Sequence, residues 1–569
     1  MKFDVVFVTY NSKKWLKGNL DSILKSNYDL KENISLYYYD NKSTDDTVNY
    51  LYELKEKYGD KFANFKIIQG KNNKGFGYGN NKAVSAGNSE YVFILNTDTE
   101  IKVDTFKELE RKINESKKDF SIFELRQEPY EHPKYYDPYS GEVSWASGAC
   151  VVFKRKVFEK IGGFDNNLFM YCEDVEISWR ARQRGYRIKY LYDVGIKHYS
   201  YSEAGEFKLN AFIYGYINNL YLRCKFGSLK NALKGLYLVS GAIVKNKASS
   251  VYDNDQYIIV SKSIRRAFYK MIFKYIGARI YKHTHRSHNS FKPQFINLLD
   301  YEAIKINPFK EVKEGKVNEN TKVSIIVRTC GRPNVLRETL VSLRNQTYKN
   351  FEVVIVEDGK NVSESMIKKE FSDLDIKYKA TNNHVGRSKA GNIAMKMASG
   401  EYFNFLDDDD LFYPNHIEVL VTEATKNDYD IVYDTAFETK INVLSKTPYK
   451  YSIHNVSIVH SGLFTRLKLY KSNLFPIQTV MFKKEVFETC GGFDEKMDAL
   501  EDWDLWIRFS LKYNFNYVKD TTSLYRVPLN STLSKERQEF IDSYLGYMID
   551  KYKDVKIEVS FADIFLSNY

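Results

Sequence analysis

Residues 323–333 read "VSIIVRTCGRP" and residues 4–11 read "DVVFVTYN", so an apolar run that contains threonine at its end occurs twice in the chain. An amphipathic helical pattern follows each run, "LRETLVSLRNQTY" in one copy and "LKGNLDSILKSNY" in the other. A second apolar run then ends in an acid, at Asp358 and at Asp40. Strands that alternate with helices predict an α/β fold with a mostly parallel sheet, in which ligands bind at the carboxyl ends of the strands.

The repeat continues in the same order through the rest of each copy. The segment "NNKGFGYGNNKAVSAGNSEYVFILNTD" ends at Asp98, and "NNHVGRSKAGNIAMKMASGEYFNFLDDDD" ends at Asp410. Each copy then has Gly-Gly-Phe-Asp followed by a Glu-Asp pair, at residues 173–174 and 501–502. Self-similarity of this kind predicts two homologous domains in tandem.

The repeat sets the domain boundaries. We place the first α/β domain at residues 1–205 and the second at residues 321–535. Residues 206–320 lack the repeated motifs and are predicted to form a helical, basic connecting region, and residues 536–569 a C-terminal helical tail. In "SIRRAFYKMIFKYIGARI" (263–280), apolar residues recur at helical spacing between arginines and lysines. Such a helix either packs against one of the domains or makes a peripheral membrane contact, and the sequence leaves both open.

Composition limits the class of protein and its location. The chain has 569 residues, 43% hydrophobic and 28% charged, which excludes a disordered or fibrous protein. Its five cysteines show no C-x-x-C pairing, so a reducing compartment fits best. No run approaches the roughly 20 apolar residues of a spanning helix, and the first residues read as a strand instead of a signal peptide. We therefore expect a cytoplasmic protein, or one held peripherally at the inner face of the cytoplasmic membrane.

Acidic residues gather where two equivalent strands end. Asp407–Asp410 follow one apolar run, and Asn96, Thr97 and Asp98 follow the other. Clustered carboxylates repel unless a cation offsets their charge or water solvates them. Mg²⁺ and Mn²⁺ take oxygen ligands and bridge to phosphate. The glycine-containing segments just before carry cations that suit phosphate, namely Lys74, Arg387 and Lys389. A metal-bound phosphate site and a solvated turn are the two interpretations, and recurrence at a strand end favours the first.

The Glu-Asp pairs begin helical patterns, "EDVEISWRAR" and "EDWDLWIRF". A carboxylate at a helix start either caps the helix or, facing a reacting hydroxyl, acts as a general base. Because the pair recurs in register with the acidic strand ends, we favour a catalytic role.

Taken in order, these motifs resemble the family 2 glycosyltransferases of the GT-A fold, in two tandem copies. In the first domain the resemblance implies that Thr9 and Asp40 line the nucleotide, that Asp98 and His198 bind metal, and that Asp174 is the base. In the second domain it implies Thr329 and Asp358 for the nucleotide, Asp407 and Asp409 for metal, and Asp502 as the base. The other nucleotide-sugar positions that it implies are Asn11, Lys74, Gly75, Asn96, Glu357, Arg387, Lys389 and Asp408. The candidates on the acceptor side are Trp145, Glu173, Glu501 and Trp503.

The sequence departs from the family pattern at three places. Asn96 replaces the leading acid of Asp-x-Asp, a form similar to that of deoxysugar and furanose transferases. Glu357 replaces the more usual aspartate. The segment "LYRVPLNSTLS" offers no histidine where His198 maps, and Asn530 is a poor substitute. These changes bear on donor choice and on whether each domain is active.

The resemblance implies a bifunctional, inverting glycosyltransferase that uses Mn²⁺ or Mg²⁺ and nucleotide-diphosphate donors of the UDP or dTDP type. The expected acceptor is a growing bacterial surface glycan, of which a lipid-linked form is one candidate. An alternative keeps one active domain and makes the other a glycan-binding or scaffold module. A nucleotidyltransferase or nucleic-acid-binding protein is a third reading, favoured by the net charge of +12. We do not expect nucleic acid as a partner, because the basic stretches lack interleaved base-stacking residues.

Overall fold

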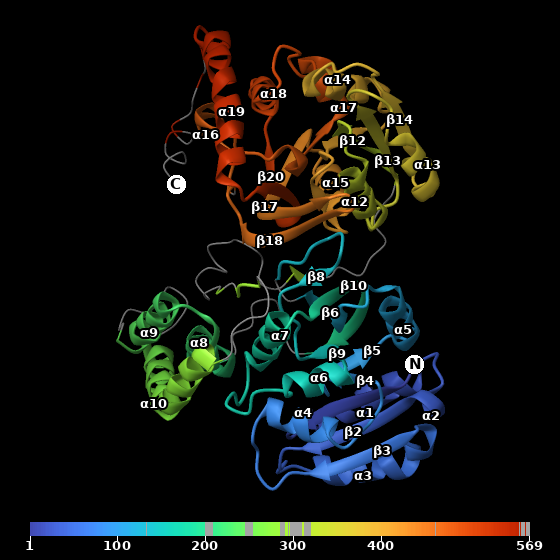
Figure 1. Ribbon diagram of the computed structural model, residues 1–569, viewed down its shortest axis with the longest axis vertical. Coiled ribbons are helices and arrows are strands. Elements are labelled where there is room, and N and C mark those ends of the chain that lie inside the picture. Colours follow the sequence, from blue (N-terminus) through green and yellow to red (C-terminus); the bar gives the residue numbers. More distant parts are fainter. Residues whose placement is uncertain are drawn as a thin grey trace. The chain divides into compact units, whose positions relative to one another are not determined.

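The computed structural model describes residues 1–131, 134–199, 209–244, 254–284, 291–293, 295, 310–311, 320–460, 462–556, 558, 561 and 564 (Figure 1). The chain divides into two compact units, one of residues 1–301 with 308–313 and one of residues 302–307 with 314–569. Part of the predicted connecting region, at residues 200–208, 245–253, 285–290, 296–309 and 312–319, lies outside the described residues, as does most of the predicted tail beyond residue 556.

The first unit is built on one large sheet. Its strands lie in the order β3-β2-β1-β4-β9-β6-β10-β5, with β8 beside β10. Their bounds are β1 Phe3–Thr9, β2 Ile34–Asp40, β3 Asn64–Gln69, β4 Tyr91–Leu95, β5 Thr99–Ile101, β6 Phe120–Glu128, β8 Glu142–Val143, β9 Cys150–Lys154 and β10 Arg187–His198. A separate two-residue pairing joins β7 (Tyr130–Glu131) to β11 (Lys310–Glu311).

Helices connect these strands and then extend past the sheet. They are α1 Lys13–Leu24, α2 Leu30–Asn33, α3 Thr47–Tyr58, α4 Phe76–Val84, α5 Thr105–Glu115, α6 Arg155–Ile161, α7 Glu173–Gln183, α8 Leu209–Phe226, α9 Leu229–Val244 and α10 Asn254–Thr284. Helices α8, α9 and α10 share one apolar cluster with Leu168, which lies just before α7. Helix α10 thus packs against the first unit through one part of its surface, and this packing leaves the question of a membrane contact open.

The second unit repeats the main strand order of the first as β14-β13-β12-β15-β19-β17-β20-β16, but its additional strand β18 pairs with β17, whereas β8 of the first unit pairs with β10, the counterpart of β20. The strands are β12 Val323–Thr329, β13 Phe351–Glu357, β14 Ile376–Ala380, β15 Tyr402–Phe405, β16 Leu411–Phe412, β17 Ile431–Lys446, β18 Tyr449–Ser457, β19 Val480–Lys483 and β20 Asn516–Pro528. The helices are α12 Pro333–Arg344, α13 Glu364–Glu370, α14 Arg387–Met397, α15 His416–Lys426, α16 Arg466–Lys471, α17 Lys484–Cys490, α18 Glu501–Ser510 and α19 Ser531–Tyr552. The predicted internal repeat and the α/β class are confirmed.

Each sheet has a parallel part and a mixed part. Strands β3, β2, β1 and β4 run parallel, whereas β9 pairs antiparallel with both β4 and β6. The parallel strands carry continuous apolar runs because helices cover both of their faces. β12 is buried along its whole length. Among the described residues, no helix has the length and apolar character needed to cross a membrane.

Candidate active sites

The carboxyl ends of β1 and β2 form the first part of the site in the first unit. The strand register sets Thr9 beside Asp40, and the Thr9 hydroxyl donates to Asp40 Oδ1 at 2.9 Å. Asp40 also accepts from the main-chain N–H and the hydroxyl of Ser43, at 2.9 and 2.5 Å. Asn11, in the left-handed region with φ 51°, accepts from the Thr44 N–H at 2.8 Å. These contacts shape the loops after β1 and β2 into a rigid edge.

A second loop reaches this edge through Asn41. Its side-chain amide donates to Gly75 O at 3.0 Å, and its oxygen accepts from the Lys74 N–H at 3.4 Å. Gly75 has φ 93° and begins α4, and a Cβ there would lie 2.1 Å from Phe169 O. Only glycine fits this position, because it is both left-handed and in contact with main chain. The exposed Lys74 ammonium lies 4.8 Å from the centre of the Tyr78 ring.

The predicted metal residues of the first unit lie together. Antiparallel pairing of β5 with β10 sets His198 opposite Thr99, so that His198 Nε2 is 3.5 Å from Asp98 Oδ1. The other ring nitrogen, Nδ1, donates to Gln127 Oε1 at 2.6 Å. Nε2 is buried without a hydrogen-bond partner among the described residues.

Two electron-pair donors that face each other in this way fit a divalent cation between them. The Gln127 contact is of the kind that orients a metal-binding histidine. No cluster of three or more His, Cys, Asp or Glu side chains gathers around one point in the described part of the chain. A metal here would therefore take its remaining ligands from water or from a bound phosphate.

Asp174 lies next to both loops. Its Oδ2 accepts from the Gly148 N–H at 3.1 Å, and the carbonyl of the next residue, Ala149, accepts from the Asn96 N–H at 2.9 Å. A Cβ on Gly148 would lie 3.1 Å from Phe76, the first residue of α4. Residues 148–149 thus join the base candidate, the Asn96–Asp98 loop and the Gly75 loop at one place.

Burial alters the acidity of the Glu-Asp pair. It raises the pKa of Glu173 to about 8, with the Asp174 charge adding to the effect, and it also raises the pKa of Asp174. Glu173 Oε2 is buried with no hydrogen-bond partner among the described residues. Lys134 contributes a positive charge that opposes the rise at Asp174 and lies 4.1 Å from the centre of the half-buried Trp145 ring. The main-chain N–H groups of Gly148 and Val175 donate to Asp174 and oppose the rise in its pKa, so Asp174 is the member whose ionised form the structure supports.

In the second unit, the register corrects one of the residue matches made from sequence. Thr329 pairs with Glu357, as Thr9 pairs with Asp40, so Glu357 is the counterpart of Asp40. Glu357 accepts from the main-chain N–H groups of Val362 and Ser363 at 3.1 and 3.0 Å. Asp358 instead matches Asn41, since it accepts from the N–H of Gly386, which begins α14 with φ 90°, at 3.1 Å. The match of Asp358 to Asp40 was wrong by one residue.

Two arginines bind three of the four aspartates in the run Asp407–Asp410. Arg328 binds Asp407 through two bonds of 2.8 and 2.9 Å and Glu501 through a third of 2.9 Å. Arg332 contacts both oxygens of Asp408 and donates to Asp409 Oδ2 at 3.0 Å. The Thr329 hydroxyl donates to Asp408 at 2.6 Å. Protein cations, which the sequence argument did not consider, therefore offset much of this charge.

These contacts give the aspartates different acidities. Burial alone would raise the pKa of Asp407, but the Arg328 charge and hydrogen bonds lower it. Burial raises the pKa of Asp408 to about 7 in spite of Arg332. Burial and the neighbouring charges of Asp409 and Asp407 hold the pKa of Asp410 well above its ordinary value.

The donor set fits a metal less well here than in the first unit. Asp407 is committed to Arg328, and Asp409, with 37% of its side chain exposed, is the more open carboxylate. The pairing of β16 with β20 sets Leu411 opposite Leu524 and thereby places Tyr525, and not Asn530, at the position of His198. A metal in this unit would depend on Asp409.

Asp502 is placed like Asp174. It accepts from the Asn473 side-chain amide at 2.9 Å, and burial, reinforced by the Glu501 charge, raises its pKa to about 6. Glu501 is buried against Arg328, whereas the Trp503 indole donates to Leu469 O at 2.6 Å. The Arg387 guanidinium lies 3.7 Å from Glu501, and Lys389 is exposed on α14.

Sequence reasoning missed Gln127, Gly148, Arg328 and Arg332. Arg328 carried a visible signal, because it directly precedes Thr329 where the first copy has the apolar Val8. Gln127 and Gly148 stand in segments without a repeated motif, so their proximity to the site depends on the fold.

Comparison with known proteins agrees with this architecture. The family model described as "Glycosyl transferase family 2" matches residues 4–175 and 324–491. An uncharacterised glycosyltransferase of Rickettsia typhi is 33% identical over 195 residues, which cover 33% of this chain and 58% of the relative. The glycosyltransferase GlyA of Streptococcus pneumoniae is 32% identical over 268 residues, or 42% of this chain and 38% of the relative. This chain therefore spans only about half the length of these two relatives.

Among solved structures, residues 1–349 of TarS from S. aureus show 17% identity and a TM-score of 0.32, over 52% of this chain and 99% of that chain. A mannosyltransferase of Pyrobaculum calidifontis, solved with GDP-Man and Mn²⁺, shows 16% identity and a TM-score of 0.31, over 51% of this chain and 76% of that chain. The fold assignment rests on the duplicated sheet and on the two family matches. With both copies matched and both sheets built in the same strand order, the chain belongs to glycosyl transferase family 2 as two tandem GT-A domains.

Proposed function

We propose that the first unit transfers a sugar from a nucleotide-diphosphate donor by a single displacement with inversion. The observation that carries the proposal is the meeting of Asp174, the Asn96–Asp98 loop and the Gly75 loop at residues 148–149. A proton acceptor close to residues that could bind a metal and a phosphate is what such a transfer needs, and this arrangement supports the proposal.

In the proposed reaction, an acceptor hydroxyl attacks the anomeric carbon. The bond from that carbon to the diphosphate oxygen breaks as the new glycosidic bond forms, and the nucleoside diphosphate leaves with the electron pair. Asp174 takes the hydroxyl proton at a carboxylate oxygen. Its contacts with the N–H groups of Gly148 and Val175 orient the carboxylate and stabilise its ionised form.

Asp98 and His198 would hold the Mn²⁺ or Mg²⁺ in the first unit. When bound, the ion would offset negative charge on the diphosphate leaving group, as a Lewis acid does. Lys74 stands on the loop before α4, from which its ammonium can reach a phosphate.

For the second unit we propose a second transferase site, with Asp502 as the base and Thr329, Glu357 and Asp409 around the donor. A single active unit with the other as a glycan-binding or scaffold module is the competing function. The commitment of Asp407 to Arg328 and the tyrosine at the position of His198 favour that competitor.

Sugar transfer by the full chain, measured with Mn²⁺ and UDP- or dTDP-sugars, tests both the two-site function and the single-site function. Asp174→Asn and Asp502→Asn should each abolish a different linkage, by about 10²- to 10⁴-fold, because each removes one proton acceptor. The exposed Asp60→Asn is the control. If Asp174→Asn abolishes a linkage and Asp502→Asn changes none, only the first unit is active. If the wild type uses none of these donors, both the two-site and the single-site function are contradicted.

We further propose that the acceptor is a bacterial surface glycan carried on lipid, and that α9 and α10 hold the enzyme at the cytoplasmic membrane. Both helices expose apolar side chains, on α9 Leu229, Leu233, Leu236, Tyr237 and Val244, and on α10 Tyr269, Phe273, Ile276 and Ile280. Asp255 is the one acidic residue of the described stretches 209–244 and 254–284, which are rich in lysine and arginine. Apolar faces flanked by cations suit an anionic lipid surface.

Vesicle sedimentation with the full chain tests this contact. We expect binding to vesicles that contain phosphatidylglycerol and weak binding to phosphatidylcholine alone. Tyr237→Glu and Phe273→Glu should reduce it, whereas Val362→Glu, at another exposed apolar residue, should not. Equal binding of all variants, or no binding at all, would contradict the proposal.

A further inference from the structure

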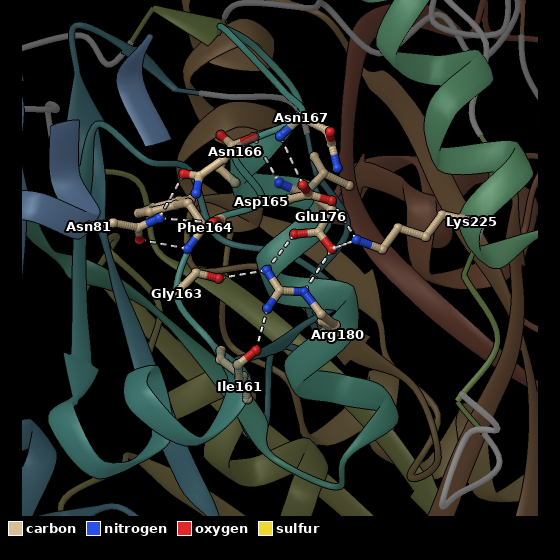
Figure 2. A network of polar contacts seen from close by, with 12 residues as sticks. Asn81, Ile161, Gly163, Phe164, Asp165, Asn166, Asn167, Glu176, Arg180 and Lys225 are labelled. Carbon is tan, nitrogen blue, oxygen red and sulfur yellow. Dashed lines mark hydrogen bonds and ion pairs between the residues drawn. The ribbon is translucent and has the colours of Figure 1, made fainter. Parts of the chain in front are cut away.

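A buried lysine joins a helix to two acids in the first unit, and the second unit repeats the arrangement. Lys225 of α8 lies 2.5 Å from Asp165 Oδ2 and 2.7 Å from Glu176 Oε1 (Figure 2). Lys551 of α19 lies 2.7 Å from Asp494 Oδ2 and 2.7 Å from Asp504 Oδ1. Asp165 and Asp494 are the aspartates of the two Gly-Gly-Phe-Asp motifs, and Glu176 and Asp504 each stand two residues after the base candidate.

A tyrosine repeats as well, four residues before each lysine. The Tyr221 hydroxyl donates to Asp165 at 2.7 Å, and the Tyr547 hydroxyl donates to Asp494 at 3.0 Å. Helix α8 and helix α19 therefore present the same Tyr-x-x-x-Lys face to the same pair of acids.

An arginine completes each network from the opposite side. Arg180 donates to Glu176 at 2.7 Å and to Gly163 O at 2.6 Å (Figure 2). Arg508 donates to Asp504 at 2.9 Å and to Gly492 O at 2.6 Å. Of these side chains, the tyrosine and the lysine stand on α8 and on α19, and in each unit they contact equivalent acids at the same spacing, so we treat α8 and α19 as counterparts.

The network lies close to the base along the chain. In the first unit it anchors both ends of the segment from Asp165 to Glu176, whose last four residues are the first turn of α7 and include Asp174. Within that loop, the Asn218 amide of α8 donates to Met170 O at 2.9 Å and Tyr171 O at 2.7 Å. Tyr171 and Cys172 adopt left-handed φ values of 65° and 64°. For residues other than glycine this conformation is strained and needs support from the surrounding structure.

We propose that α8 and α19 are docking helices, which means that each packs onto its own transferase unit and is an integral part of it. Lys225 and Lys551 are then positioning residues: through their acids they hold in place the turn that carries the base, residues 168–176 in the first unit and residues 494–504 in the second. The role of that turn rests on the proposed function. Lys225 and Glu176 are buried. If the Lys225 ammonium is removed, Asp165 and Glu176 lose a positive charge that stabilises them in a place that water does not reach. The turn should then open more often.

Hydrogen–deuterium exchange on the full chain tests the proposal without any sugar donor. Lys225→Met should speed exchange of the amides in residues 168–176 by at least about tenfold and leave residues 494–504 as in the wild type. Lys551→Met should give the mirror result. Lys230→Met, at an exposed lysine of α9, is the matched control and should change neither segment.

A kinetic comparison separates positioning from general damage. Lys225→Met should lower turnover of the first unit by about tenfold or more while the affinity for the donor nucleotide changes by less than about twofold. The double variant Asp165→Asn/Lys225→Met, which restores the charge balance, should regain part of the protection and turnover, and it keeps the test decisive if the single variant unfolds.

Unchanged exchange in residues 168–176, or faster exchange in both units alike, would overturn the inference. A wild type that protects the turn but transfers no sugar would contradict the proposed function alone.

Discussion

Arg328 and His198 show how single residues give two related sites different electrostatics. In the first unit an apolar valine precedes Thr9, and Asp98 faces the buried Nε2 of His198, which has no hydrogen-bond partner among the described residues. In the second unit, an arginine in the valine's place bridges Asp407 and Glu501. The first site has Asp98 and His198 placed to bind a metal cation, whereas the second site already contains the guanidinium cation of Arg328.

Loss of the Arg328 charge should destabilise the second unit. Arg328→Met leaves Asp407 and Glu501 without their shared counter-charge in a buried position, so we expect a loss of about 3–5 kcal/mol in the free energy of unfolding. Arg337→Met, which breaks a half-exposed pair with Glu370, should cost no more than about 1 kcal/mol. Denaturant unfolding of both variants gives the comparison, and equal losses would show that Arg328 does not neutralise the site.

The acidity of Asp502 sets a pH dependence for the second unit. A general base must be ionised, and burial raises the pKa of Asp502 to about 6, so turnover should fall as the pH drops through about 6. Asn473 donates to Asp502 and lowers its pKa, so Asn473→Ala should move the midpoint to higher pH. A pH–rate profile that stays flat from pH 5 to 8, or a midpoint that Asn473→Ala moves to lower pH, would rule out Asp502 as the base.

At the scale of elements, strand ends bring the site together, and this much could be predicted from sequence. The repeated apolar runs located β1, β2 and β4 and their counterparts, because buried parallel strands leave a strong pattern. The match of Asp358 to Asp40 failed because adjacent acids at 357 and 358 fit the pattern equally, and only the pairing of Thr329 with Glu357 distinguishes them. Side-chain partners such as Gln127 come from strands that the motifs do not describe.

The turn before α4 gives a test at this scale. Gly75→Ala adds a Cβ 2.1 Å from Phe169 O at φ 93°, so it should destabilise the first unit by more than the roughly 1 kcal/mol of backbone strain and weaken nucleotide binding. Gly185→Ala is the matched control, since its φ is 88° and nothing lies within 4 Å of the new Cβ. Calorimetric melting and nucleotide titration of both variants measure the difference. Similar effects of the two substitutions would mean that contact with Phe169 is not what makes glycine necessary.

The whole molecule is a duplication that extends farther than its motifs. Sequence comparison ended each copy near the last strand, and α8 and α19 fell into a predicted connecting region and a predicted tail. The equivalence of α8 and α19 rests on a tyrosine and a lysine four residues apart. Two identical residues are too few to be recognised as a repeat in the sequence. The structure brings these residues to equivalent acids in each unit. Each unit thus has its own sheet, acidic strand end, Glu-Asp pair and docking helix.

If the duplication yields two nucleotide sites, both should be detectable by a thermal-shift titration of UDP and dTDP, with and without Mn²⁺. The wild type, Asp98→Ala and Asp409→Ala would be compared, with Asp60→Ala as the control. We expect metal-dependent stabilisation in the wild type, with each site variant losing a different part of it, because each acid serves its own unit. Stabilisation that needs no metal, or that survives in both site variants, would show that the chain does not have two metal-dependent nucleotide sites at Asp98 and Asp409.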